Sequence, residues 1–576
     1  MNQTGEVADR SIARWASTGL STALVVTTAL TIGCWLPRIL GKSDNEAMES
    51  PLMLSVARQL ISSPAELYGP FGRTNPLVLI HAPLYYRAAA LLAWPMVRLG
   101  IGPVDAARIS GRLLSFAGLI ATAIAAGRLA RVGGRSRRAG WWAAGLVVSA
   151  PVLAGIPYAV RPDMLGVACQ TWAVALTAEG LASVGTRRGM GRRMVVASFL
   201  FGLALCVKQH LVAAWAVTVV WVAVSWLRGR VAVRLLVLAT VPGLVVAGLI
   251  YGTEWRVTGG RIWDATFVAA ASIGRVHPGS WDNVCLLFLG ILERSAGLVT
   301  LLAAAPAVAA AARVPVFRAT VAAIGTIAVS LVLVAYVNYT LTSFESPEKG
   351  RTGALITLCV GVCAVVAAVE TFFSRDRRAD GADRGAPLGW YIAVELAFVV
   401  LLSRQSTGAW LNYAIPATVF AAALAGRGLS GLPQLPNPRW VAVPVGLAAI
   451  LLVITCIGSL SEDRWRARRE REFVERILTH RSLDRSSYFF TDRPGINRLD
   501  GRLELVHDDW LYPVFERVGL AEPRSRWLGN ALSSPGPVRA VVVTSPDPRI
   551  EGTSLDLRRL GYHGDIRIGP FYVWIR

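Results

Sequence analysis

Residues 194–226 read MVVASFLFGLALCVKQHLVAAWAVTVVWVAVSW, an apolar block broken near its centre by Lys208-Gln209-His210 and flanked on both sides by Arg. A membrane-spanning helix needs about 20 apolar residues to cross roughly 30 Å of hydrocarbon. Because Lys and Arg gather in cytoplasmic loops, both ends of this block are expected on the cytoplasmic side. The block is therefore predicted to be a hairpin of two short helices, with the polar residues in its outer turn.

The rest of the chain repeats this apolar pattern. Of its 576 residues, 54% are hydrophobic and 17% are charged, whereas soluble domains average about 25% charged residues. The mean hydropathy is +0.48. Other apolar blocks of spanning length occupy 17–39, 106–127, 232–252, 284–311, 319–340 and 440–460. A lipid-embedded backbone must satisfy its hydrogen bonds within helices, so the chain is predicted to be an α-helical polytopic membrane protein.

Charge and cysteine content exclude two other classes. The net charge of +22 is due to Arg, because only three residues are Lys. Much of the Arg lies in short loops between apolar blocks, where it orients a membrane protein, so no nucleic-acid partner is expected. All seven cysteines fall in apolar segments, which favours neither a disulfide framework nor a Cys-rich metal site.

The Arg-rich loops also allow the spans to be counted. The Arg residues near the N-terminus and the Arg cluster at 128–138 must both be cytoplasmic. Two crossings between them satisfy this condition, so the short segment 83–99, which carries Arg87, is predicted to lie on the outer face within one long outer segment, 41–105. The same count gives thirteen spans, the last of them 440–460.

Two domains follow from this count. Residues 1–460 form the predicted transmembrane domain, and 461–576 form a small extracytoplasmic α/β domain of open role. Arg residues just after the last span favour a cytoplasmic C-terminus, but long domains cross membranes regardless of local charge. We therefore expect a multi-pass plasma (inner) membrane protein with a cytoplasmic N-terminus. Strand-like and helical patterns in the second domain lie at Ser487–Thr491, Val538–Thr544 and Ile566–Ile575, and near 509–520.

Polar residues gather on the predicted outer side, where all six histidines and all three lysines fall. Just after the first span, Ser43-Asp44-Asn45-Glu46 has the spacing of a capping box, in which Glu46 reaches back to the first helical amide. Such capping would fix two carboxylates at the membrane surface. Asp44 or Glu46 is then a candidate general base for a hydroxyl proton.

Two further outer motifs carry alternatives. Ile80-His81-Ala82-Pro83-Leu84-Tyr85-Tyr86 fits a turn with interfacial tyrosines, or a site in which His81 contacts a phosphate and Tyr85 and Tyr86 stack on a sugar. In Arg161-Pro162-Asp163, Pro162 opens a helix well and Asp163 suits a first turn. Functionally, Asp163 is a second carboxylate near the first, with Arg161 beside it.

Ionisable groups within apolar segments are costly and usually functional, so Lys208 is the leading candidate to pair with a lipid phosphate. Gln209 and His210 accompany it in the same turn. Lys349 and Arg351 are similar candidates, or simple anchors of a helix end. Asn412 and Tyr413 begin a helix, where polar helix packing and ligand contact are equally open. These candidates complete the predicted binding set.

Together these motifs resemble the GT-C superfamily of polyprenyl-phosphate-dependent glycosyltransferases. The resemblance is greatest to the branch containing protein O-mannosyltransferases and the lipid A aminoarabinose transferase. The matching features are the acidic motif after the first span, Pro83–Tyr86, Arg108, Arg161–Asp163, Lys208 and Asn412-Tyr413. The acidic motif departs from the adjacent Asp-Glu of that branch, because Asn45 separates the two acids. Either acid is therefore a candidate for the base.

The resemblance implies a sugar donor carried on a polyprenyl monophosphate such as undecaprenyl phosphate. The base would deprotonate an acceptor hydroxyl, whose oxygen would attack the anomeric carbon with inversion. Preorganised cations would stabilise the leaving phosphate, and Lys208, His81 and Arg351 are placed for this. A divalent metal is possible. The acceptor is a glycan, a lipid or a protein, and the sequence leaves open which of these it is, which sugar is transferred and what the oligomeric state is. The rival function is a transporter or lipid flippase, which places ionisable residues near the bilayer midplane.

Overall fold

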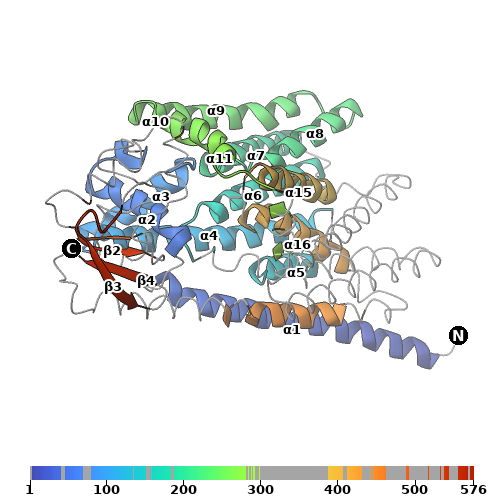
Figure 1. Cartoon of the computed structure of the whole chain (residues 1–576). Coiled ribbons are helices and arrows are strands. Elements are labelled where there is room, and N and C mark those ends of the chain that lie inside the picture. Colours follow the sequence, from blue (N-terminus) through green and yellow to red (C-terminus); the bar gives the residue numbers. More distant parts are fainter. Residues whose placement is uncertain are drawn as a thin grey trace.

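The computed structural model describes most of the chain before residue 280 and several segments after it. The described residues are 3–40, 46–68, 79–133, 135–150, 158–182, 187–280, 387–406, 411–430, 445–458, 488–491, 538–543, 556–568 and 571–575, with a few isolated positions between them. Helices make up nearly all of the described part before residue 461, and a small sheet follows (Figure 1).

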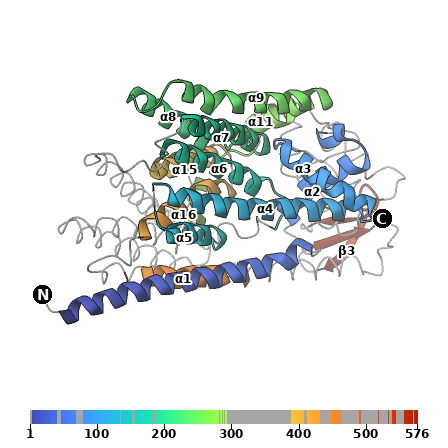
Figure 2. The same ribbon diagram turned by 180° about the vertical axis from the view of Figure 1, so that it is seen from behind.

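The described helices fall into those that form the bundle and those that lie between them in the sequence. The bundle helices are α1 (Gln3–Leu40), α4 (Pro103–Arg131), α5 (Arg137–Val148), α6 (Asp163–Ala182), α7 (Arg187–Val207), α8 (Ala213–Leu227), α9 (Arg234–Val257), α15 (Leu388–Gln405) and α16 (Ile415–Leu429). The others are α2 (Glu46–Ile61), η1 (Pro64–Tyr68), α3 (Leu84–Arg98), α10 (Arg261–Trp263), the π-helical η3 (Asp264–Ala269), α11 (Ala270–Val276) and η4 (Leu411–Ala414). In Figure 2, α9, α7, α6 and α4 follow one another as packed neighbours.

The prediction of a polytopic helical membrane protein is confirmed. Among the described residues, five helices are long and apolar enough to cross a membrane: Arg14–Leu40, Pro103–Arg131, Gly189–Val207, Arg234–Val257 and Leu388–Gln405. On α9, a row of large apolar side chains that includes Val241, Leu244 and Leu249 is exposed, as contact with lipid requires. Segments 319–340 and 351–373, and most of 284–311, lie outside the described residues, so the count of thirteen spans stays a prediction.

Two local features of the predicted topology are present. The apolar block 194–226 is divided, because α7 ends at Val207 and α8 begins at Ala213. Segment 83–99 forms the 15-residue helix α3, which packs on α2 and α4. Arg87 of α3 makes a bidentate ion pair with Glu254 near the end of α9, at 2.8 and 2.6 Å, and donates to Gln59 Oε1 of α2 at 2.7 Å. Arg87 makes this segment a poor candidate for a membrane span, and in the structure it joins α2 and α3 to α9.

Small residues let α4 and α6 pack closely. A Cβ atom on Gly118 of α4 would lie 2.7 Å from the backbone nitrogen of Leu165 and from the carbonyl carbon of Met164. Both of these residues belong to the first turn of α6, directly after Asp163. The absence of a side chain at Gly118 therefore sets the position of the α6 N-terminus against α4.

The described part of the C-terminal region forms one sheet of β1 (Tyr488–Thr491), β2 (Val538–Val543), β3 (His563–Ile568) and β4 (Phe571–Ile575). The strand order is β1-β2-β4-β3, with β1 and β2 parallel and the other pairs antiparallel. The single strand predicted over Ile566–Ile575 is wrong, because β3 and β4 pair antiparallel and the chain reverses between them. The sequence between the two strands reads Gly569-Pro570, a dipeptide typical of turns. Nearly all of the helical pattern at 509–520 lies outside the described residues.

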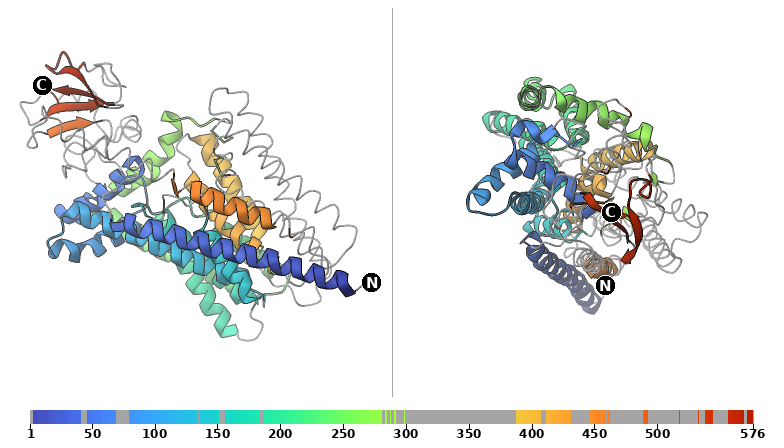
Figure 3. Two further views of the ribbon diagram at one scale, coloured as in Figure 1. Left: turned by 90° about the horizontal axis from the view of Figure 1, so that it is seen from below. Right: turned by 60° about the vertical axis from the view of Figure 1, so that its left-hand side comes forward.

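The sheet lies at the end of the molecule where α1 finishes at Leu40, opposite the N-terminus (Figures 1 and 3). The short helices α2 and α3 lie at the same end. We call this the sheet end of the molecule. That it faces the extracytoplasmic side stays a prediction from the span count.

We expect Gly118→Ala to lower the midpoint of thermal unfolding of the purified protein, followed by intrinsic fluorescence in detergent. Overpacking of this kind costs about 1–3 kcal/mol. Gly248→Ala on α9 is the matched control, because no described atom lies within 4 Å of its added Cβ, and Ala otherwise favours a helix over Gly by roughly 0.5–1 kcal/mol. Equal midpoints for the two variants would contradict the close α4–α6 contact.

Candidate functional site

Asp163, the first residue of α6, lies at the centre of a buried polar cluster. Its Oδ1 accepts hydrogen bonds from Lys208 Nζ and from Asn412 Nδ2, the latter at 2.8 Å, and its Oδ2 accepts one from Arg161 Nε at 3.0 Å. The side chains of Asp163 and Lys208 are each 2% exposed. Three segments far apart in the sequence, the α6 N-terminus, the α7–α8 turn and η4, therefore meet at one carboxylate.

The rings of His210 and Tyr413 pack together beside Lys208. Lys208 Nζ lies 4.9 Å from the centroid of the Tyr413 ring, within the range of a cation–π contact. The imidazole of His210 lies 4.5 Å from the same ring, centroid to centroid, at an interplanar angle of 37°. The predicted Asn412-Tyr413 pair and the Lys208-Gln209-His210 turn thus contact each other directly.

Gln209 binds backbone instead of facing the cluster. Its Nε2 donates to the carbonyl oxygen of Ile80 at 2.7 Å and to that of Thr266 in η3 at 3.3 Å. The carbonyl oxygen of His81 in turn accepts a hydrogen bond from the Tyr68 hydroxyl at 2.6 Å. The amide of Gln209, predicted to bind substrate, is here used to hold the His81 segment and η3 against the α7–α8 turn.

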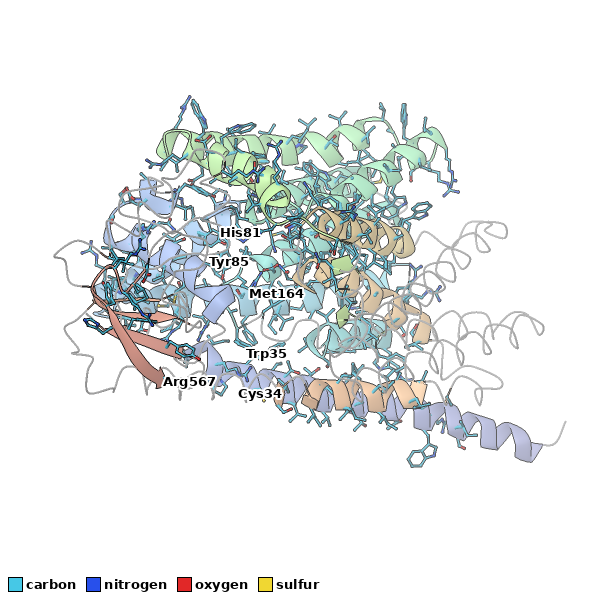
Figure 4. The ribbon with its side chains drawn as sticks, in the orientation of Figure 1. Cys34, Trp35, His81, Tyr85, Met164 and Arg567 are labelled. Atoms are coloured by element: carbon cyan, nitrogen blue, oxygen red, sulfur yellow. The ribbon has the colours of Figure 1, made fainter. Side chains whose placement is uncertain are left out.

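His81 lies within the electrostatic reach of this cluster. In the projection of Figure 4, His81, Tyr85 and Met164, the residue after Asp163, fall in one region of the molecule. Desolvation lowers the pKa of His81 to about 3, and the positive charges of Lys208 and Arg161 act in the same direction. His81 is therefore neutral near pH 7. This differs from the predicted cationic role and leaves it a hydrogen-bonding one.

The two tyrosines of the predicted motif differ in their surroundings. Tyr85 is fully buried, and its hydroxyl donates to the Gly111 carbonyl oxygen at 2.7 Å and lies 3.0 Å from Ser115 Oγ. Ser115 Oγ donates to the Arg161 carbonyl oxygen at 2.9 Å. Tyr85 thus supports the Arg161 segment through α4 and has no exposed ring face for a sugar. The Tyr86 hydroxyl is buried without a hydrogen-bond partner among the described residues, and it interacts electrostatically with Arg161 and Asp163.

Several predicted residues are not placed. Asp44, Lys349 and Arg351 lie outside the described residues. Glu46 is described only as the first backbone position of α2. Within the described ranges, no group of three or more His, Cys, Asp or Glu side chains comes together as a metal site. The meeting of the acidic motif with the Asp163 cluster, and any metal there, stay predictions.

One buried ionisable residue was not singled out from the sequence. It is Glu395 of α15, which is 2% exposed and accepts a hydrogen bond from Gln170 Nε2 at 2.5 Å. A lone acid in the apolar block 388–403 is the signal that marks it, because ionisable residues are rare within spans.

Comparison with known proteins gives similarity at the level of the fold. No protein-family model and no curated protein sequence matches the chain. The crystal structure of ArnT from Cupriavidus metallidurans bound to undecaprenyl phosphate is similar over 96% of this chain and 97% of that one, with 15% identity and a TM-score of 0.48. Archaeal oligosaccharyltransferase AglB from Archaeoglobus fulgidus, in complex with an inhibitory peptide and a dolichol-phosphate, is similar over 92% of this chain and 69% of that one, with 13% identity and a TM-score of 0.45.

The pKa of His81 leads to a pH-dependent stability. The unfolded chain protonates His81 near its ordinary pKa of about 6.5, whereas the folded chain does so only near about 3. Between these values the unfolded state binds more protons, so stability falls as the pH is lowered. We expect His81→Gln to lose less thermal stability than the wild type between about pH 7 and about pH 5. Identical pH dependence of the two unfolding midpoints would show that folding does not lower the pKa of His81.

Proposed function

We propose that this chain transfers a sugar from a polyprenyl-phosphate donor to an acceptor hydroxyl on the extracytoplasmic face, with inversion at the anomeric carbon. The observation that carries this proposal is the charge balance around Asp163. Two cations, Lys208 and Arg161, are hydrogen-bonded to a single carboxylate, and among the described residues no second carboxylate is bonded to either. A buried cluster with a surplus positive charge is costly unless an anion completes it.

A lipid phosphate is the anion that suits a bundle end next to hydrocarbon. When the bond between the anomeric carbon and the phosphate oxygen breaks, its electron pair stays on the phosphate. Fixed cations stabilise that developing charge without reorganisation during the reaction. Lys208 and Arg161 are fixed by Asp163, and the Lys208 ammonium group also contacts the Tyr413 ring. Neutral His81 and the Tyr86 hydroxyl are the neighbouring hydrogen-bond donors.

The base is assigned to the acidic motif after the first span. Asp163 is a poor base, because its carboxylate already accepts hydrogen bonds from three side chains. Asp44 or Glu46 would take the proton of the acceptor hydroxyl as that oxygen attacks. Glu46 begins α2, which lies at the same end of the molecule as the sheet (Figure 1). We assign the domain at 461–576 to recognition of the acceptor. The transfer assay described below would identify the class of acceptor and the sugar that is transferred.

The test is transfer by the purified protein in liposomes that contain undecaprenyl-phosphate-linked sugars, followed as release of undecaprenyl phosphate. Substituting the base, by Asp44→Asn or Glu46→Gln, should lower the rate roughly 10²–10⁴-fold, the usual contribution of a general base. Lys208→Met should raise the half-saturating donor concentration roughly 10- to 150-fold, because hydrogen bonds to charged groups contribute about 1.5–3 kcal/mol.

The matched control is Arg128→Met, which removes an ion pair with Glu179 in which the Arg128 side chain is 44% exposed. Exposed pairs contribute little, so its rate should stay within about twofold of the wild type. If the lipid-linked sugar instead crosses the bilayer intact and no transfer occurs, the chain is a transporter or flippase and the proposal is wrong.

A further inference from the structure

A second buried polar group lies about two helical turns along α6 from Asp163. Its centre is Glu395 of α15, whose carboxyl group accepts hydrogen bonds from Gln170 Nε2 at 2.5 Å and from the backbone N–H of Ala214. Gln170 is fully buried and lies on α6, two turns after Asp163. An ionisable side chain inside a span is costly and points to a role.

The partners of Glu395 belong to the segments that build the site. Gln170 shares α6 with Asp163, and Ala214 follows the turn that carries Lys208. Glu395 itself lies on α15, which leads into η4 with Asn412. The same three segments are therefore joined twice, once by the hydrogen bonds of Asp163 and once by those of Glu395.

Ala214 lies in the first turn of α8, where backbone N–H groups have no partner within the helix. Val212, the residue before α8, makes no side-chain cap. The Glu395 carboxyl group supplies an acceptor for this N–H from another helix. Without it, a buried N–H would be unpaired, at a cost of about 1–3 kcal/mol, in a region that water does not reach.

We propose that Glu395 is a positioning residue: it caps α8 and, through Gln170, holds the Lys208 turn in register with α6 so that Lys208 is fixed to receive a phosphate. The consequence for phosphate binding rests on the proposed function. The positioning itself does not, because it concerns only how the turn is held.

The chain offers a matched control on the same pair of helices. The hydroxyls of Tyr391 on α15 and Thr218 on α8 are hydrogen-bonded at 2.7 Å. They lie one turn from Glu395 and Ala214, on the side away from Lys208. If Glu395 only joined α8 to α15, Glu395→Ala and Tyr391→Phe would have equal effects on the Lys208 turn. If Glu395 positions that turn, only Glu395→Ala should affect it.

The experiment compares the full-length wild type with Glu395→Ala, Glu395→Gln and Tyr391→Phe in nanodiscs. Amide hydrogen exchange of residues 208–214 is the first readout, and binding of undecaprenyl phosphate is the second. Glu395→Ala should speed exchange in this segment and weaken binding roughly tenfold, as the loss of buried hydrogen bonds predicts. Glu395→Gln keeps an acceptor oxygen for Ala214 and should restore both readouts, and Tyr391→Phe should leave both unchanged. If Glu395→Ala does not fold, Gln170→Leu is measured in its place.

Unchanged exchange of 208–214 in Glu395→Ala would overturn the inference. Faster exchange with wild-type binding would overturn it as well, because the turn would then not govern the site. Should the wild type fail to bind undecaprenyl phosphate, the proposed function falls while the exchange data still decide the positioning role.

Discussion

The hydrogen bonds that the Asp163 carboxylate accepts from Lys208, Arg161 and Asn412 are the constraint on which the site depends. Charges removed from water must be paired or otherwise solvated by protein. One carboxylate therefore brings together a helix N-terminus, an interhelical turn and a 3-10 turn that the chain separates by up to 249 residues. Among the described residues, this cluster has two cations and one anion, and the proposed lipid phosphate would supply the further negative charge.

The surrounding structure keeps that arrangement rigid. Gln209 ties the Lys208 turn to the segment of His81 and to η3, and Tyr85 supports the backbone of Arg161 through Ser115. The Arg87–Glu254 pair fixes the short helices α2 and α3 to α9. A site for a leaving phosphate needs this preorganisation, since stabilisation comes from groups already in place when charge develops.

Apolar bulk and polar contacts have separate roles here. Exposed Val and Leu side chains on α9 face outward as in a lipid-embedded helix, while small residues such as Gly118 let α4 and α6 approach. Two of the buried polar groups, at Asp163 and at Glu395, each join α6, the α7–α8 region and the segment from α15 to η4. The bundle is thus held by packing along its length and by hydrogen bonds near the proposed site.

The sequence alone determined the class of protein and the break between α7 and α8, because hydrocarbon thickness and the cost of buried charge act on each segment separately. It also indicated Arg161, Asp163, Lys208 and Asn412 as polar positions at span ends. Tertiary structure decided which of them meet, that Gln209 binds backbone, that Tyr85 is packed away while Tyr86 lies near the cluster, and that Glu395 caps α8. These outcomes depend on helix rotation and on distances between remote segments. A pattern along one segment carries no information on which side chain of another helix it will face.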